Sequence, residues 1–584
     1  MRTTASALGY TIIAAGLATC LPLPAYAAGD TTGSASSSNA GSTSDTSTTI
    51  ADSGPATPAL DAPSGGLLAR SGIDGGMTDL REHLLAAYGV PEAKTAGPAW
   101  RFTPSLGAAV TYTDNAGLSD TGQSGNADEY FDLTPGIIIR HDDQPIEVDL
   151  SYMPTAHIYV QNGNYSQVQQ NFDGHALATV WPGWVYFDVR GSASQQSVFG
   201  STAASSQQNQ GPGNRQTTTT GSISPYIAHG FGDAGMLQAG YGYIISDTGN
   251  PSYANTYQPF PGAPPGLYAS STLTTQRGFA SFTTGEGLGR VQNRVNLDSN
   301  FYSGTITLNN AERITLSDEA SYAINRYIAA VGQVGYENLS YPNIGYSYRG
   351  PTGSGGATFT PNVTSTLTLQ YRYVDGKGGV FAQGSWQVSP RIRVFGGYSE
   401  GISSSQQDAQ NSLLSADATT TGAGANRLVA GPLLNSASSA GADQQINAVK
   451  RLDMSASWLL DRDVFTVSVN HEDRAPVGNA VVGQPVPLLS VSINASAGWQ
   501  HDLRENLSLA VSANYNTSQS GFAGGGSLDT VSVSVGLTRP LSPTLTASLR
   551  YDGRMTLNST QGYAVAANAN DTQNSVSLQV VKRF

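Results

Sequence analysis

Few residues in this chain have the types and spacing that catalysis requires. Its seven histidines, at positions 83, 141, 157, 175, 229, 471 and 501, form no HExxH motif and have no companion at metal-ligand spacing. The densest titratable group is His471-Glu472-Asp473-Arg474, a possible acid/base cluster. Neighbouring side chains of an extended strand point to opposite faces, however, so His471 and Glu472 are poorly placed to act together.

The sequence also shows no residues arranged for hydrolysis by a serine nucleophile or for thiol chemistry. His141 and His501 stand beside acidic residues in turn-like segments, where a solvated polar turn is the simpler interpretation. The 67 glycines and many serines produce fragments of a G-x-S-x-G motif by chance, without a nucleophile elbow. Cys20 is the only cysteine, and it lies in a segment that we expect to be removed. We therefore predict that the protein is not an enzyme and has no cofactor and no metal centre.

Charged side chains recur at every second position of several segments. Residues two apart share one face of a strand, so each group of charges lies on one side of a sheet. Charges facing lipid are very costly and are tolerated only against water or one another. Inside a barrel they predict a polar channel for a hydrophilic solute or, alternatively, a lumen closed by salt bridges. The predicted lumen residues are Glu147, Asp149, Arg372, Arg393, Arg451, Asp453, Arg550 and Asp552.

The elements that must position these charges are strands with one apolar face, of which residues 506–517 are an example. The apolar face holds Leu507, Leu509, Val511, Ala513 and Tyr515, and the other face holds Ser, Ala and Asn. This alternation is typical of outer-membrane barrel strands, with lipid on one side and a lumen on the other.

The same pattern repeats from residue 100 to the end of the chain. It predicts an all-β fold, a transmembrane antiparallel up-and-down β-barrel of about 22 strands, within a range of about 18 to 24. Broken apolar faces leave the number of strands in 276–345 open. A barrel of this size encloses more space than its side chains fill, which favours an aqueous lumen.

Connections and aromatic residues agree with a barrel. Short segments such as 141–145 and 461–463 alternate with long polar ones such as 114–126 and 403–445, as periplasmic turns alternate with external loops. Aromatic residues on the apolar faces predict two interfacial girdles, with Trp beside short turns and Tyr beside long loops. These residues are Trp100, Trp386, Trp458, Trp499, Tyr112, Tyr373, Tyr515 and Tyr551.

One long loop, 249–275, carries aromatic residues that could contact a solute. They are Tyr253, Tyr257, Phe260 and Tyr268. Such side chains could stack on sugar rings or fold inward as a constriction, although the simpler interpretation is that they keep the loop compact.

The N-terminal part predicts export. Arg2 precedes an apolar run over 10–23, and Ala25-Tyr26-Ala27 has the small-x-small pattern of a signal-peptidase site, so we expect cleavage near Ala27. A lipoprotein signal at Cys20 is the disfavoured alternative. The expected organisation is a signal peptide (1–27), a low-complexity disordered periplasmic leader (28–76), a short helix over 78–88 with its linker at the barrel mouth (77–99), and an outer-membrane barrel (100–584). We expect the helix to rest at the mouth rather than plug the barrel.

Charge and the final strand bear on partners. A net charge of −13 argues against nucleic acid, whose phosphates need clustered Lys and Arg. The last strand alternates and ends in the aromatic Phe584, which is similar to the signal by which outer-membrane barrels are handed to their assembly machinery. The expected partners are therefore the outer-membrane bilayer and the barrel-assembly machinery, and the expected location is the Gram-negative outer membrane.

Several stretches resemble one family of large barrels. They are TPSLGAAVTYTDNAGL at 103–118, DLTPGIIIR at 132–140, EASYAINRYIAAVGQVGYENLSY at 319–341, TFTPNVTSTLTLQYRYVDG, and KRLDMSASWLLDRDVFTVSVNHEDR at 450–474. The chain from about residue 100 onward thus resembles the PEP-CTERM system-associated outer-membrane proteins and the related beta-barrel porin 2 proteins of exopolysaccharide loci. The resemblance implies an outer-membrane component of polysaccharide production or surface sorting.

Four functions compete at this point. The first is a pore for export of a secreted polysaccharide, with polysaccharide and envelope secretion components as partners. The second is a general diffusion or uptake porin for small hydrophilic solutes. A TonB-dependent receptor is disfavoured because only about seventy residues, mostly low-complexity, separate Ala28 from Trp100. The third is a non-transporting structural barrel or an autotransporter translocator. The fourth, an outer-membrane lipase or protease, lacks a nucleophile set.

Overall fold

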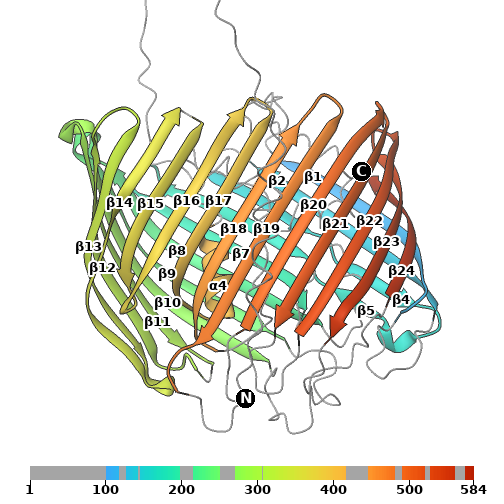
Figure 1. Ribbon diagram of the computed structural model, residues 1–584, viewed down its shortest axis with the longest axis horizontal. Helices are drawn as coiled ribbons and strands as arrows, with labels where there is room; N and C mark the ends of the chain where they lie inside the picture. Colours follow the sequence, from blue (N-terminus) through green and yellow to red (C-terminus); the bar gives the residue numbers. More distant parts are fainter. Residues whose placement is uncertain are drawn as a thin grey trace, which may run out of the picture. The chain divides into compact units, whose positions relative to one another are not determined.

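The computed structural model describes residues 100–116, 127–141, 145–197, 215–249, 270–305, 307–362, 364–415, 445–479, 490–519, 527–559 and 572–584. The expected signal peptide, leader and short helix, and the four aromatic residues of loop 249–275, lie outside these residues. The described strands form one antiparallel sheet that closes on itself, because β1 pairs with β2 on one side and with β24 on the other. Figure 1 shows the strands tilted around the barrel.

The described residues of the first half of the barrel form strands β1 to β12 and the short 3₁₀ helices η1, η4 and η5. The bounds are β1 (Arg101–Thr113), β2 (Asp128–His141), β3 (Ile146–Tyr152), β4 (Thr155–Tyr159), η1 (Gly163–Tyr165), β5 (Gln167–Gln169), β6 (Phe172–Trp181), β7 (Val185–Ser197), β8 (Arg215–Gly230), η4 (Gly232–Ala234), β9 (Gly235–Thr248), β10 (Ser271–Thr284), η5 (Glu286–Leu288), β11 (Val291–Ser303) and β12 (Ala311–Ala323).

The second half contains strands β13 to β24 and the α-helix α4. The bounds are β13 (Ile328–Tyr341), η6 (Pro342–Ile344), β14 (Tyr346–Asn362), β15 (Ser365–Val374), β16 (Lys377–Ser389), β17 (Ile392–Ser403), α4 (Ser405–Ser415), β18 (Asn447–Leu459), β19 (Asp463–Pro476), β20 (Ser490–Arg504), β21 (Leu507–Gln519), β22 (Ser527–Ser542), β23 (Leu545–Ser559) and β24 (Thr572–Arg583). Among the described residues, no helix is long and apolar enough to cross a membrane.

We call each full-length strand of the barrel wall a stave, whether it consists of one strand segment or of two in succession. The 24 strand segments make 22 staves. β3 and β4 both pair with β2 and together form one stave, and β5 and β6 form the next. Pro154 stands at the break between β3 and β4, where a residue without an N–H cannot continue the ladder of hydrogen bonds. The predicted fold class and the predicted 22 strands are confirmed, and residues 276–345 hold most of β10, all of β11 to β13, and η6.

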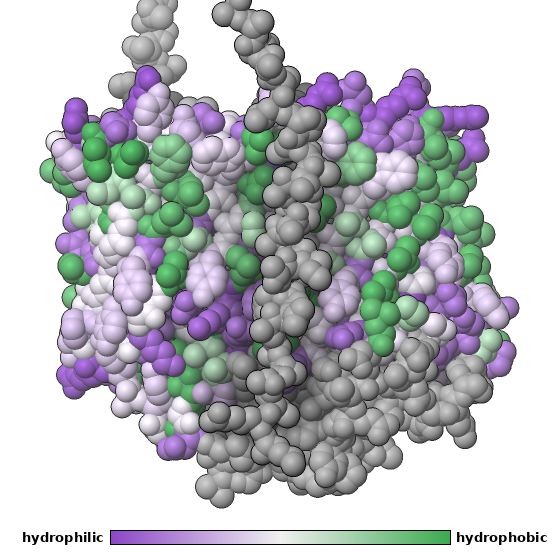
Figure 2. Space-filling model, in the orientation of Figure 1, coloured by the Kyte–Doolittle hydropathy of each residue, from purple (hydrophilic) through white to green (hydrophobic). Residues whose placement is uncertain are grey.

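The two faces of each stave meet different solvents, which is why the sequence alternates. Outward residues are large, apolar and exposed: Val334 is 69% exposed and Tyr371 is 62% exposed. Inward residues are mostly Ser, Thr, Asn, Gln and paired charges. Figure 2 shows apolar side chains over the outer face of the barrel and hydrophilic ones along the rim with the short turns. An apolar band outside and a polar lining inside is the arrangement that lipid requires.

The two ends of the barrel carry different connections. Short turns join strands at one end, for example at 182–184 and 390–391. The other end carries the long connections, but two of its links are short: η6 between β13 and β14, and Asp375-Gly376 between β15 and β16. Asp375 and Gly376 have φ of 55° and 71°, as a two-residue Asp-Gly hairpin turn requires. The long-loop end of the barrel therefore has a low rim along β13 to β16, which means that no long loop extends from these strands. The expectation that long and short connections alternate strictly did not include these two short links.

Candidate functional site: a helix across the barrel lumen

The segment expected to be an external loop at 403–445 begins instead with the helix α4. Ser404 caps this helix, because its Oγ accepts from Gln407 N at 3.2 Å and its own N–H donates to Gln407 Oε1 at 2.9 Å. This reciprocal pair is a capping box, which satisfies two backbone donors at the helix start. The expectation of an irregular loop was therefore wrong for residues 405–415. These residues lack the apolar stripe by which a helix is recognised in a sequence, but the cap at Ser404 allows a helix to begin here.

The N-terminal half of α4 is fixed to the ends of β9 and β10. Gln406 Nε2 donates to Ser271 Oγ at 2.6 Å, and Thr275 Oγ1 donates to Gln410 Oε1 at 2.7 Å. Gln410 Nε2 also donates to the Leu273 carbonyl at 3.3 Å. Both glutamines are buried. Buried amides need partners, so these hydrogen bonds hold the helix against this part of the wall.

Asp408 reaches β18 and β19 instead. Its Oδ2 accepts from Arg474 Nη2 at 2.8 Å and lies 3.4 Å from Arg451 Nη2. Glu472 bridges the same two arginines, accepting from Arg451 Nη2 at 2.6 Å and from Arg474 Nε at 2.5 Å. The Arg474 and Glu472 side chains are only 1% and 2% exposed. Two positive and two negative groups thus balance in a largely buried cluster, as burial of charge demands.

The C-terminal end of α4 is held by β7. Arg190 Nη1 donates to the carbonyls of Leu413 and Leu414 at 3.2 and 3.0 Å, where the helix leaves carbonyls unpaired and favours a cation. Arg190 itself is gripped on two sides by Asp188, at 2.8 Å each, and Asp188 also binds His175 Nε2 of β6 at 3.1 Å. The arginine is therefore fixed in place before it meets the helix.

These contacts lie on separate parts of the wall. β18 is nine strand pairings along the sheet from β9, in a barrel of 22 staves. α4 is therefore a strut across the lumen, tied to β7, β9 and β10 at one side and to β18 and β19 at the other. Figure 1 shows the helix inside the barrel, behind β18.

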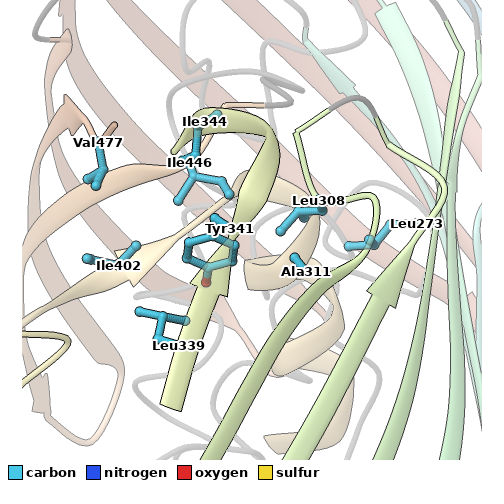
Figure 3. Packing of buried hydrophobic residues seen from close by; sticks show 9 residues of the cluster. All are labelled: Leu273, Leu308, Ala311, Leu339, Tyr341, Ile344, Ile402, Ile446 and Val477. Carbon is cyan, nitrogen blue, oxygen red and sulfur yellow. The ribbon is translucent and has the colours of Figure 1, made fainter. Parts of the chain in front are cut away.

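An apolar cluster fills the space beside this strut at the long-loop end. It joins β10 to β13 with the ends of β17, β18 and β19 (Figure 3). Backbone hydrogen bonds join the same segments: Asn479 N donates to the Ile344 carbonyl at 2.7 Å, and Val477 N donates to the Ile446 carbonyl at 3.1 Å. The cluster therefore packs the part of the lumen bounded by β10 to β19. Its buried members are Leu273, Leu308, Ala311, Leu339, Tyr341, Ile344, Ile402, Ile446 and Val477.

A second buried charge cluster holds the low rim. Arg313 of β12 binds Asp375 Oδ1 at 2.7 Å and Glu337 Oε1 at 3.0 Å. Asp375 Oδ2 accepts from Ile402 N at 3.0 Å, and Glu337 Oε2 accepts from Asp375 N at 2.8 Å. The Asp375 turn is thus tied to β12, β13 and β17 together, which fixes the wall on which the apolar cluster packs.

The eight predicted lumen residues all lie on the strand faces opposite the exposed apolar side chains, as their parity requires. Arg550 and Asp552 form an ion pair at 2.7 Å, whereas Arg451 binds Glu472 and Asp408, and Asp453 accepts from Asn470. The guanidinium of Arg372 lies 3.4 Å above the Phe381 ring. Of the others, Asp149 lies 3.6 Å from Arg140, Arg393 is buried, and Glu147 is half-buried on β3.

The predicted girdle residues lie on the outer face. Trp100, Trp386, Trp458 and Trp499 are next to the short-turn end, and Tyr112, Tyr373 and Tyr515 are toward the long-loop end. Tyr551 is at the middle of β23 and not near the long-loop end as predicted. Trp458 and Trp499 both contact Phe465, with ring centroids 5.5 and 6.3 Å apart. Trp499 Nε1 also donates to Asp463 at 2.8 Å. Aromatic rings with one polar contact are typical of a bilayer interface.

The histidines and Phe584 have local partners. His157 binds Asp132 at 2.6 Å, His501 binds Asp463 at 2.8 Å, and His471 lies on the opposite face from Glu472. Among the described residues, no group of three His, Cys, Asp or Glu could hold a metal ion. Phe584 N donates to the Pro104 carbonyl at 2.9 Å, and its side chain is exposed.

Of the residues that hold α4, sequence reasoning named Arg451 as a lumen residue but did not connect it to a helix. Asp408 falls in the segment taken as a loop, and Arg190 is far from it in sequence. One signal was available, because Ser404-x-x-Gln407 matches the capping-box pattern. The His471-Glu472-Asp473-Arg474 group was noticed for catalysis, but Glu472 and Arg474 instead share the lumen face, where Arg474 binds Asp408 of the helix and Glu472 pairs with Arg474.

A closed barrel of 22 staves, apolar outside and polar inside, defines an outer-membrane β-barrel protein. No protein-family model and no curated protein matches the sequence. Similar solved structures include the FrpB iron transporter from Neisseria meningitidis (F3-3 variant), with 9% identity, a TM-score of 0.46 and coverage of 86% of this chain and 83% of that chain. The siderophore receptor PiuA from Acinetobacter baumannii has 8% identity, a TM-score of 0.44 and coverage of 82% of each chain.

A mutant of the ferric enterobactin receptor PfeA from Pseudomonas aeruginosa is a third such structure. It has 10% identity, a TM-score of 0.42 and coverage of 83% of this chain and 80% of that chain. At these values the likenesses say nothing about a solute, so the function must be argued from the lumen itself.

Proposed function

We propose that the protein is an outer-membrane pore that passes carbohydrate, with export of a secreted polysaccharide as its role. The observation that carries this proposal is the uncharged wall of β20 to β22. Its inward residues over 490–500, 508–518 and 530–538 are Ser, Thr, Asn, Gln, Ala and Gly, with no charge among them.

Such a wall suits a polyhydroxylated chain. Ser512 and Ser534 hydrogen-bond across two strands at 2.7 Å, and Ser468 and Ser496 do so at 2.5 Å. Hydroxyl and amide groups exchange hydrogen bonds with sugar hydroxyls at little net cost, because water is replaced by similar partners. Without fixed charges the wall holds no solute tightly, which lets a polymer slide. The α4 strut then narrows the route that the polymer takes past this wall.

The proposal is tested in two ways. Purified protein in planar bilayers should conduct, and neutral malto-oligosaccharides should block the current transiently, with longer residence for longer chains. Deletion of the gene should leave polysaccharide inside the envelope. If the purified protein showed no conductance and the deletion strain secreted polysaccharide normally, the proposal would be refuted.

The placement of α4 favours one alternative, a diffusion porin for small hydrophilic solutes. A helix tied to both sides of the lumen limits the size of what passes. A porin of this kind admits mono- and disaccharides in liposome swelling and excludes longer chains, and its deletion slows uptake without affecting secretion. The two functions therefore differ in the length of carbohydrate that enters the pore.

A further inference from the structure

Arg554 is a lumen-facing arginine on β23, at the half of the strand toward the long loops. It lies opposite Ser532 of β22 and Gln573 of β24 in the sheet register. Its strand neighbour Met555 is an exposed apolar residue of the outer face, so Arg554 points inward. β22 on one side belongs to the uncharged wall described above.

Among the residues that the structure describes, no acidic side chain pairs with the guanidinium of Arg554. Its Nη1 is buried and has no hydrogen-bond partner. The acidic residue two positions before it, Asp552, is already bound by Arg550 Nε at 2.9 Å and Nη2 at 2.7 Å. Several other inward arginines have acidic partners: Arg190 with Asp188, Arg313 with Asp375 and Glu337, and Arg474 with Glu472 and Asp408.

A guanidinium with a buried and unpaired Nη1 is unfavourable, because that nitrogen has lost water without gaining a hydrogen bond or an opposite charge. The group that would satisfy it is a planar or tetrahedral oxyanion, since the guanidinium fork matches two oxygens of a carboxylate or phosphate. Ser532 beside it offers a neutral hydroxyl for the rest of a ligand, whereas Gln573 is buried and donates to the Asn115 carbonyl at 2.6 Å.

We propose that Arg554 is the centre of an oxyanion-binding site in the lumen. The bound group is either a carboxylate carried on a sugar chain or free inorganic phosphate. If the proposed pore function holds, the site makes this barrel selective for acidic over neutral carbohydrate, and the inference then rests on that function. Binding itself requires only the folded barrel.

Equilibrium binding to the full-length protein in detergent micelles tests the site without requiring conductance. The probes are trigalacturonate, maltotriose and inorganic phosphate, each at low ionic strength. The variants are Arg554→Gln, which removes the charge, and Arg554→Lys, which keeps it without the fork. Arg277→Gln is the matched control, because Arg277 also points inward but is bound to Asp298 at 2.5 Å. The heat-dependent shift in gel mobility shows whether each variant is folded.

We expect the wild type to bind trigalacturonate or phosphate more tightly than maltotriose. Arg554→Gln should weaken that binding by about tenfold or more, the worth of one charge-assisted pair, and Arg554→Lys should weaken it less. Arg277→Gln should bind as the wild type does. Tight trigalacturonate with weak phosphate binding assigns the sugar-borne carboxylate, and the reverse assigns the free ion.

Equal affinity of folded Arg554→Gln and wild type for both anions would overturn the site, as would the absence of anion binding by the wild type. A barrel that binds the anion but conducts no current would refute the pore function and leave the oxyanion site standing.

Discussion

Neutralising Asp408 should release the α4 strut. In Asp408→Asn the side chain keeps its size but loses its charge, while Arg451, Arg474 and Glu472 remain. The cluster that was balanced then carries one excess positive charge, with Arg474 only 1% exposed. We expect the helix to leave its docked position more often, because the excess positive charge is unfavourable while it is buried and is stabilised when water reaches it.

The size of the effect follows from the contacts. Asp408 contributes one short charge-assisted bond, at 2.8 Å, and one long one, at 3.4 Å. A charge-assisted hydrogen bond is worth about 1.5–3 kcal/mol, and the side chain is 19% exposed, which lowers its share. A loss of about 2–3 kcal/mol raises the undocked fraction by about thirtyfold to about 150-fold.

Single-channel recording in planar bilayers measures this fraction as the frequency of large-conductance openings. The double variant Asp408→Asn/Arg451→Gln has a balanced cluster again and should open less often than Asp408→Asn alone, which makes the pair non-additive. Ser405→Ala, next to the cap but outside the charge cluster, is the matched control and should match the wild type. If Asp408→Asn opened no more often than Ser405→Ala, the strut would not be held by this cluster.

Other substitutions test the wall. Leu549→Arg places a charge on the outer face and should destabilise the barrel by about 2–4 kcal/mol in denaturant unfolding from lipid vesicles, whereas Ser548→Arg on the inner face should change stability little; equal effects would reverse the assigned faces. Asp375→Asn should cost about 2 kcal/mol in the same assay, because Arg313 loses the counter-charge that the buried Asp375 supplies; a neutral result would contradict that role. Gly376→Ala should cost about 1 kcal/mol or more, since φ is +71° and a Cβ would meet the Tyr348 ring at 2.7 Å, while Gly355→Ala, with no atom within 4 Å, should cost less. Similar losses for the two alanine variants would show that the hairpin turn is not the constraint.

The strands of this barrel were predictable from sequence because two solvents act on every one of them. A residue such as Leu509 or Val533 must be apolar to face lipid, and its neighbours must be polar to face the lumen, so the alternation is written along the whole strand. The count of 22 followed from repeating that rule. The break at Pro154 was not foreseen, because the two short strands on either side of it still alternate as one.

The contents of the lumen were not predictable in the same way. α4 is a polar helix with no apolar stripe, so periodicity does not reveal it, and the short Ser404–Gln407 cap is its main signal. Which wall residues bind it depends on where the helix crosses. Arg190 and Asp408 are more than two hundred positions apart, and the hydrogen bonds of Arg190 to the end of α4 exist only once the barrel has closed. Alternation placed the charges inside but could not pair them.

The way charge is distributed inside the barrel separates the parts that hold from the parts that pass. A strut must stay in place, which calls for strong directional contacts, and the pairs around Asp408 and Arg190 supply them. In the proposed pore a moving solute calls for weak and exchangeable contacts, and the inward residues over 490–500, 508–518 and 530–538 are all neutral. Arg554 fits neither class, since it is charged but its Nη1 has no hydrogen-bond partner and it pairs with no acidic residue of the described chain. A charge of this kind next to a neutral wall is placed to sort what moves along that wall, which is why anion binding rather than stability is the measurement that decides its role.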